Sequence, residues 1–575
     1  MNTHVKCKLS LRHILCALAF IFLVLPLHLS AQTSPLADRL PPDTIFYVQW
    51  HGKAFLADAD KQNHLLQLLE DPDFTPLWQL AAKNFQQNGA KQSAGAKPPE
   101  FGDILSLLDG AGVFGVVANP ARQGKPVSDG TSSPFGVFLV YDSRGKRELI
   151  QKLQASSRGK EASPVSSYDF GGMKVEFQTT GKDTSYTALA ADYFLFANQK
   201  SVIEDLIARF RSGTPSTSIA QLPEYQSIRK NFDSTAAIEY FFHMPDLNAL
   251  VPPDQKNLQS VRVMQGLHLD KIHAAAGSIS FSGPATRFRG EVLGDTSPGS
   301  LFDVAGPSSA TFLTQSIAGN NPNFNLSRMN FVSLYKLIRN AVVGNVPPQQ
   351  AANIKAAEAM AQNFLGMPIT DALDLFTGEI ASTASFADDG TELRMYAATI
   401  QKPSEVLRVV RAVGATMMVA EDSSGDTTFL DLAFPYKDPS TSQQRKKFYY
   451  VAVTPQMLLA APRKAMLREA IERLKSPGPP TGGMFENAEY LQLRAHLPEK
   501  LSGLSGSDLA HVPWDKMFAT FTSQFEAAMK SQGQTPTDQS WLKLIKPDVV
   551  SRHLHMSVSG WWKDSNGIHF DSYVE

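Results

Sequence analysis

Two kinds of apolar periodicity follow one another along this chain, and together they predict an α+β protein. Residues 43–50, DTIFYVQW, and 193–198, YFLFAN, are short runs rich in β-branched and aromatic residues, which is typical of strands. Residues 201–211, SVIEDLIARFR, repeat apolar positions at helical spacing. Because most predicted strands are sequence neighbours joined by short turns, we expect mostly antiparallel sheets with helices packed on one face.

The same order of elements occurs twice, which predicts an internal duplication. Residues 193–212 match 457–476 in the order of apolar and polar positions, and 101–110 match 369–378 in the same way. Small changes in the offset between matched segments are what loop insertions would produce. The resulting domain boundaries are a first repeat at 32–293, a Pro-, Gly- and Ser-rich linker at 294–309 and a second repeat at 310–575.

Residues 107–117, LLDGAGVFGVV, contain the glycine spacing of dinucleotide-binding loops at Gly110, Gly112 and Gly115. Such a loop needs a strand before its glycines and a helix after them, so that the helix amino terminus meets the phosphates. Here the helical pattern comes first and the strand pattern follows. We therefore expect no nucleotide site. Instead, we expect Gly110 and its counterpart Gly378 to end matched helices in the left-handed conformation.

The amino terminus resembles a secretory signal peptide. A basic start precedes the apolar residues 14–27, and the small residue Ala31 follows shortly after, which predicts cleavage behind Ala31. An uncleaved membrane anchor is the alternative, but a 14-residue run that contains Pro26 is short for a span of about 20 residues. We expect an exported, periplasmic or extracellular protein whose mature chain has no transmembrane segment. That chain has no cysteine, because Cys7 and Cys16 lie in the signal.

Charge argues against some partners. The chain carries a net charge of −1, and loss of Lys6, Lys8 and Arg12 with the signal leaves −4. A chain with this balance has no overall attraction to nucleic acid or to an anionic membrane. The basic run 445–447 lies between polar residues and a strand pattern, which predicts a solvated turn. No motif for a cofactor stands out, and we expect none.

Three histidines are the main candidates for a metal site. His553 and His555 would point to the same side of a strand, where both imidazoles could bind zinc, and His569 on the returning strand could supply a third ligand, with His511 as the alternative. The alternative is a solvated sheet face, because the first repeat has small residues after His273 at the matching place.

The neighbouring Trp561 and Trp562 are candidate ligand contacts. Consecutive residues of a strand face opposite sides of a sheet, so one indole can be buried while the other stays partly exposed. An exposed tryptophan of an exported protein can stack on a sugar ring. It can also cover a sheet edge or pack against a helix.

Residues 36–50, LADRLPPDTIFYVQW, and 186–210, YTALAADYFLFANQKSVIEDLIARF, resemble the uncharacterised bacterial exported family catalogued as domain of unknown function 3352. The resemblance implies an α+β fold and an envelope or secreted location. It brings no functional residues.

Two classes of function remain open. The first is a non-catalytic envelope protein, a binding or structural module for a partner protein, peptide or lipid-like ligand. The second is a secreted hydrolase or glycan-acting enzyme whose residues meet only in the folded chain. A pocket with convergent histidines and carboxylates would support the enzyme, and a shallow apolar groove would support the binding module. We expect the main concavity at the junction of the two repeats.

Cleavage behind Ala31 would leave Gln32 as the first residue of the mature protein. We expect amino-terminal sequencing of the protein from its native host to begin at that residue. An intact Met1 end in the soluble fraction would contradict the prediction.

Overall fold

The computed structural model describes the chain over a series of ranges separated by gaps. The described ranges are 36–52, 61–76, 78–79, 82, 102–103, 106–118, 135–156, 164–180, 183–211, 217–233, 235–244, 262, 265–312, 314, 321–388, 390–437, 444–475, 483–519 and 546–575. The predicted signal peptide at 1–31 lies outside them.

The first half of the chain contributes ten strands in the described ranges, and all of their pairings are antiparallel. Their spatial order is β4-β5-β6-β7-β3-β2-β1-β8-β9-β10. Their bounds are β1 Thr44–Trp50, β2 Gly112–Ala118, β3 Phe135–Asp142, β4 Ser166–Phe170, β5 Met173–Thr180, β6 Asp183–Ala190, β7 Tyr193–Ala197, β8 Ala236–His243, β9 Ile272–Ser282 and β10 Ala285–Gly294.

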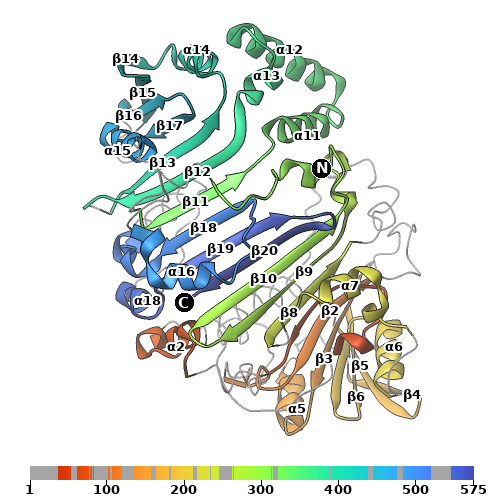
Figure 1. Ribbon diagram of the computed structural model, residues 1–575. Coiled ribbons are helices and arrows are strands. Elements are labelled where there is room, and N and C mark those ends of the chain that lie inside the picture. Colours follow the sequence, from red (N-terminus) through yellow and green to blue (C-terminus); the bar gives the residue numbers. More distant parts are fainter. Residues whose placement is uncertain are drawn as a thin grey trace.

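The second half contributes ten further strands in the described ranges, ordered β14-β15-β16-β17-β13-β12-β11-β18-β19-β20. Each strand number of the first series, raised by ten, gives the second. The two series join where β10 pairs with β20, which makes one antiparallel sheet (Figure 1). The bounds are β11 Asn323–Arg328, β12 Phe376–Phe386, β13 Glu392–Ile400, β14 Met418–Ser424, β15 Thr427–Lys437, β16 Gln444–Val453, β17 Met457–Ala461, β18 Gly503–Asp508, β19 Met556–Lys563 and β20 Gly567–Val574.

Helices lie between the strands in a similar order in both halves. An antiparallel sheet together with these helices makes the class α+β. In the first half they are η1 Leu36–Arg39, α2 His64–Glu70, η3 Pro72–Phe74, α5 Arg147–Ser156, α6 Lys200–Arg211, η5 Ile219–Gln221, α7 Pro223–Arg229 and η6 Leu269–Lys271. In the second half they are η7 Leu301–Val304, α11 Phe331–Val343, α12 Pro348–Leu365, α13 Ile369–Asp374, α14 Pro403–Gly414, α15 Lys464–Lys475, η8 Gly483–Glu486, α16 Ala488–Arg494, η9 Leu509–His511 and α18 Pro547–His553. No helix in these described ranges is both long and apolar enough to cross a membrane.

Helices cover both faces of the sheet, so the expectation of a single covered face was wrong. On one face, which we call the α6 face, α6 and α7 pack over Tyr47 and Phe138, and α15 and α16 pack over the matching strands of the second half. On the opposite face, Ile150 of α5 packs with Trp50 and Phe114, and α14 packs with β13 and β16. Strands such as β2 are apolar on both sides, and each side therefore needs cover.

The glycines that imitate a dinucleotide loop belong to the sheet. Gly112 and Gly115 lie in β2, after the turn that contains Gly110, so a strand follows the glycines. The rings of Trp50 and Phe138 occupy the space in which side chains at Gly112 and Gly115 would lie. These glycines allow close packing of aromatic rings against the strand.

Of the prediction for the two matched glycines, only the positive φ of Gly378 is confirmed. Gly378 has a φ of +94°, whereas the φ of Gly110 is outside the left-handed region. Gly378 does not end a helix, because α13 stops at Asp374 and Gly378 lies within β12. It occupies an irregularity in the pairing with β13, where a Cβ atom would lie 2.6 Å from the carbonyl oxygen of Met329.

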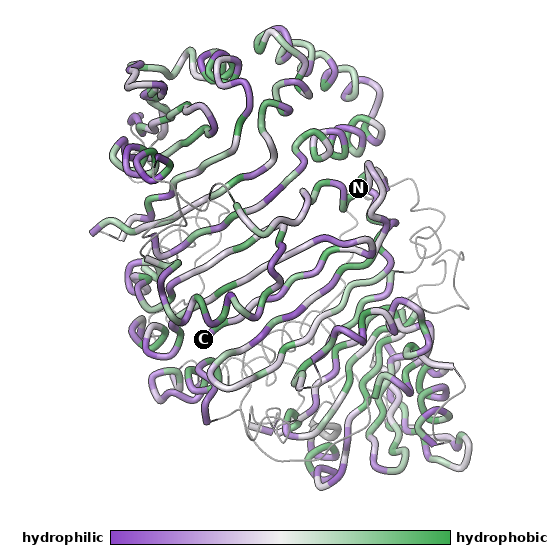
Figure 2. The backbone as a smooth tube through the Cα atoms, viewed as in Figure 1, coloured by the Kyte–Doolittle hydropathy of each residue, from purple (hydrophilic) through white to green (hydrophobic). Residues whose placement is uncertain are grey.

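The structure also shows where the basic run, the predicted linker and the hydrophilic positions near the β10–β20 pairing lie. The basic run 445–447, predicted to be a turn, lies in the exposed part of β16. The predicted linker runs from the end of β10 through η7 and lies against the second half, with bridges from Ala305 to Met329 and from Ser309 to Leu501. Hydrophilic positions are interspersed along the strands on either side of the β10–β20 pairing (Figure 2).

Replacement of Gly378 by alanine should lower the free energy of unfolding by about 1–3 kcal/mol, because the side chain is strained at positive φ and crowds Met329. Gly102→Ala is the control, since nothing lies within 4 Å of its added Cβ and its φ is ordinary. Urea denaturation measures both. Equal midpoints for the two variants would contradict this role of Gly378.

Candidate functional site

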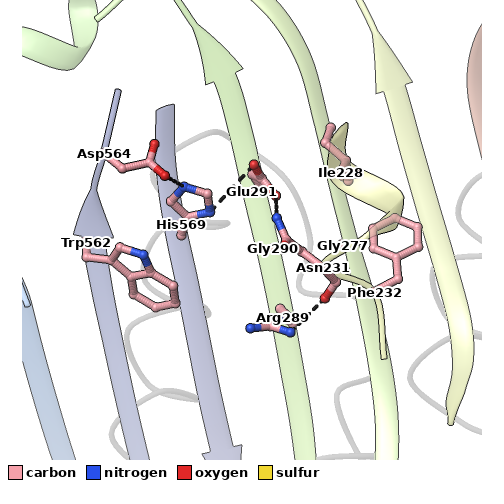
Figure 3. A pocket seen from close by; sticks show the side chains of 11 residues that line it. Ile228, Asn231, Phe232, Gly277, Arg289, Gly290, Glu291, Trp562, Asp564 and His569 are labelled. Atoms are coloured by element: carbon pink, nitrogen blue, oxygen red, sulfur yellow. Dashed lines mark hydrogen bonds and ion pairs between the residues drawn. The ribbon is translucent and has the colours of Figure 1, made fainter. Parts of the chain in front are cut away.

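A cavity of about 190 Å³ opens on the α6 face where the two halves meet (Figure 3). We call the β10–β20 pairing the seam and this space the seam cavity. The first half supplies the loop after α7 and parts of β9 and β10, and the second half supplies β19, β20 and the turn between them. The lining residues are Ile228, Asn231, Phe232, Ala276, Gly277, Arg289, Gly290, Glu291, Trp562, Asp564 and His569.

The register of four strands builds the floor of the cavity. Ala276 of β9 pairs with Glu291 of β10, Glu291 pairs with His569 of β20, and His569 pairs with Trp562 of β19. Directly paired residues of antiparallel strands point to the same face. The small side chain of Ala276 lies at one end of this row and leaves room beside Glu291.

His569 lies between two carboxylates and against an indole. Its Nε2 is 3.0 Å from Oδ2 of Asp564, and its Nδ1 is 3.6 Å from Oε1 of Glu291. The ring of Trp562 stacks on the imidazole, with 5.3 Å between the centroids and 13° between the planes. Glu291 is 5% exposed and His569 is 9% exposed, whereas the side chain of Asp564 is 43% exposed, so water reaches this arrangement from the Asp564 side.

The pKa of the Asp564 carboxyl lies below its usual range. Burial raises this pKa, but a hydrogen bond from the backbone N–H of Asn566 and the neighbouring imidazole of His569 together lower it by more. The ionised carboxylate therefore contributes stability above the ordinary carboxyl pKa. That contribution is lost as the pH falls through the lowered pKa of the folded protein.

A buried carboxylate joins the two halves beside the cavity. Asp571 of β20 is 1% exposed, and Arg287 of β10 donates to both of its oxygens, at 2.9 Å from Nε and 2.5 Å from Nη2. This bond raises the pKa of the Arg287 guanidinium. Nε of Arg289 is 3.7 Å from Asp571, so one carboxylate serves two guanidinium groups. Bidentate pairing of this kind fixes geometry as well as charge.

The loop after α7 closes over this charged row. Asn231 donates from Nδ2 to Glu291 at 2.8 Å, and its carbonyl oxygen accepts from Arg289 at 2.7 Å. Asp233 accepts from the hydroxyl of Ser280 at 3.1 Å and lies 3.4 Å from Arg287. The loop therefore forms one wall of the cavity and is held to the seam strands by hydrogen bonds and ion pairs.

The structure brings together two of the residues singled out in the sequence, Trp562 and His569. Trp561 faces the opposite side of the sheet, as alternation along a strand requires, and lies over Gly503. Trp562 is the indole that lines the cavity.

The three candidate metal ligands lie in different surroundings. The strand expected to carry His553 and His555 begins only at Met556, because His553 ends α18. His553 contacts Asp71 at 2.8 Å, and His555 lies 3.7 Å from Glu489. Within the described ranges, no three His, Cys, Asp or Glu side chains form a group that could hold a metal ion.

Sequence reasoning missed the polar half of the cavity. Arg287, Arg289 and Glu291 occupy alternate positions of β10, so they share a face of a strand that is otherwise apolar. Charged residues at alternate positions of a central strand are unusual, and this pattern in the sequence could have indicated the polar side of the cavity. Their partners on β20 lie some 280 residues away, and the sequence gives no sign of that pairing.

The comparison with known families concerns the first half of this site. Residues 108–293 match the model of a family described as "Protein of unknown function (DUF3352)". This segment runs from β2 almost to the end of β10, so it contains the residues with which the first half lines the cavity. The resemblance seen in the sequence is thereby confirmed over this segment, which ends one residue before β10 does.

Other comparisons add little to the DUF3352 match. No curated protein matches the chain. Among solved structures, crystal forms I and III of TP0453 are similar to 46% of this chain and to 81% of theirs, with 9% identity and a TM-score of 0.23 in both cases. A likeness this low assigns neither fold nor function.

Arg287→Met should lower the free energy of unfolding by about 3 kcal/mol, because it leaves Asp571 buried without its bidentate partner. Lys174→Met is the control, since its pair with Glu176 is exposed and contributes at most about 1 kcal/mol. Urea denaturation measures both. If the two variants are equally stable, the Arg287–Asp571 pair does not hold the seam.

Proposed function

We propose that this chain is an exported, non-catalytic binding module that holds a small ligand in the seam cavity. The observation that carries the proposal is the composition of the cavity wall: side chains from both halves converge on one space, with an indole and several polar groups turned toward it. Junctions between similar units are common places for ligand sites. The signal-like amino terminus supports an envelope or secreted location.

We also infer that the two halves arose by internal duplication. The repeated pairing scheme supports this, and so does the place of the matched segments. Residues 193–212 form β7 and α6, and residues 457–476 include β17 and α15, which are equivalent in the two series. The helices α7 and α16 are equivalent as well.

The loops after the equivalent helices α7 and α16 differ, and the difference supports a ligand site on the first-half side of the seam. The loop after α7 presents Asn231 and Asp233 to the seam strands. The loop after α16 instead places the apolar Leu497 and Leu501 over Gly560 of β19, so close that a Cβ atom at Gly560 would lie 3.0 Å from Leu497 and 3.1 Å from Leu501. One half thus carries polar recognition groups, and the other half seals its part of the sheet with leucines.

An enzyme is the second candidate, and one observation favours it. His569 lies between Glu291 and Asp564, and a histidine with two carboxylates can move protons. However, among the described residues that line the seam cavity, none is a serine, threonine or cysteine that could act as a nucleophile. A reaction at this site would have to use water, activated by a carboxylate or by His569.

Ala276→Leu tests the binding proposal, because the larger side chain fills the floor of the cavity. Ala275→Leu is the matched control, since it makes the same change one residue away on the opposite face of β9. Each variant and the wild type are purified in full length from the native envelope and denatured. Mass spectrometry then identifies any small molecule that is released.

We expect one small molecule to accompany the wild type and Ala275→Leu in about equal amounts, and to be absent from Ala276→Leu. Retention by Ala276→Leu, or release of nothing by the folded wild type, would contradict a ligand in the seam cavity. Incubation of the recovered molecule with fresh protein separates the two candidate functions, since a binding module returns it unchanged and an enzyme converts it.

A further inference from the structure

We propose that the ligand of the seam cavity is a neutral, hydroxyl-rich ring, namely a single sugar residue. This inference rests on the proposed function and adds the chemical class of the ligand. It follows from the combination of donors, acceptors and aromatic walls around one small space.

The charged groups of the cavity already have partners within the protein. Glu291 accepts from Asn231 and lies beside His569, and Asp564 lies 3.0 Å from the same imidazole. Arg289 donates to the carbonyl oxygen of Asn231 and lies near Asp571. A ligand with a full charge would have to displace one of these partners, which costs most free energy at the buried Glu291 and His569.

Hydrogen-bonding capacity remains after these contacts. A carboxylate offers about four lone-pair positions and a guanidinium five N–H donors, and the contacts within the protein use only part of them. Glu291 and Asp564 can accept from hydroxyl groups, and Arg289 can donate to them. A sugar hydroxyl both donates and accepts, so it suits a wall that offers both kinds of group.

The aromatic residues supply the apolar part of such a site. Trp562 lies on the β19 side of the cavity and Phe232 on the side of the loop after α7, as Figure 3 shows. A sugar ring carries C–H groups on its faces and hydroxyl groups around its edge. Two apolar walls with a polar floor between them match that division.

The size of the cavity limits the ligand to one ring. A volume of about 190 Å³ lies below the roughly 300–1,000 Å³ of pockets that hold drug-sized ligands. The space suits a monosaccharide or one residue of a longer glycan, with the rest of the glycan in solvent.

Isothermal titration calorimetry of the full-length mature protein tests the proposal. The probes are D-glucose, D-galactose, D-mannose and N-acetyl-D-glucosamine, together with the β-1,4-linked tetramer of N-acetyl-D-glucosamine. Glycine, L-lysine and inorganic phosphate represent charged ligands. We expect at least one sugar to bind with a Kd below about 1 mM and the charged probes to give no heat. Tighter binding of the tetramer than of its monomer would identify a glycan as the source.

Two variants locate the sugar. Trp562→Ala should weaken binding at least tenfold, whereas Trp561→Phe, on the opposite face of the same strand, should bind as the wild type does. Ala276→Leu is the second variant, because it keeps Trp562 and its stacking on His569 while filling the floor. Far-UV circular dichroism shows that each variant is folded.

The outcomes separate this inference from the proposed function. Binding of glycine, lysine or phosphate instead of every sugar overturns the sugar ligand, as does release from the native protein of a molecule that is not a saccharide, and both leave a binding module in place. Sugar binding that survives both Trp562→Ala and Ala276→Leu overturns the assignment to the seam cavity. A native protein that releases nothing and binds none of the probes overturns both proposals.

Discussion

The pairing of β10 with β20 is the constraint on which the rest of this structure depends. It is the strand pairing through which the first-half and second-half series of the described ranges become one sheet. The register of this pair sets Arg289 opposite Asp571 and Glu291 opposite His569. A slip of one residue would turn every one of these side chains to the other face and leave Asp571 among apolar groups. The buried charges therefore specify one alignment of the halves.

The seam cavity follows from the way in which each half covers its own strands. On the α6 face, α6 and α7 cover the first core, while α15 and α16 cover the second. The strands between these cores lie under loops, and the two loops differ in chemistry. Leucines close the β19 side near Gly560, whereas a polar loop follows α7. A polar loop needs polar partners below it, and β10 provides them at alternate positions.

Local sequence patterns predicted much of the fold, because strands and helices leave a signal within ten or so residues. The helix α6 and the strands β1 and β7 were predicted in this way, and so was the order in which elements recur. The errors have non-local causes. Helices on both faces depend on which strands become central in the sheet. The ring of Tyr141, from a strand distant in the sequence, occupies the space that a side chain at Gly110 would need. His553 and His555 lie where α18 gives way to β19.

The site was predictable only as far as residue type allowed, since Trp562 and His569 attract notice in any strand. The first-half residues that lie beside His569 could not be predicted, because that contact depends on the pairing register of β10 with β20. Under the proposed function, that same dependence links binding to assembly of the sheet. Glu291, Arg289 and His569 line the cavity and also lie in the rows that join the two halves. A ligand that bound only this folded arrangement would stabilise it by mass action. The proposed recognition and the joint between the halves thus depend on one set of side chains.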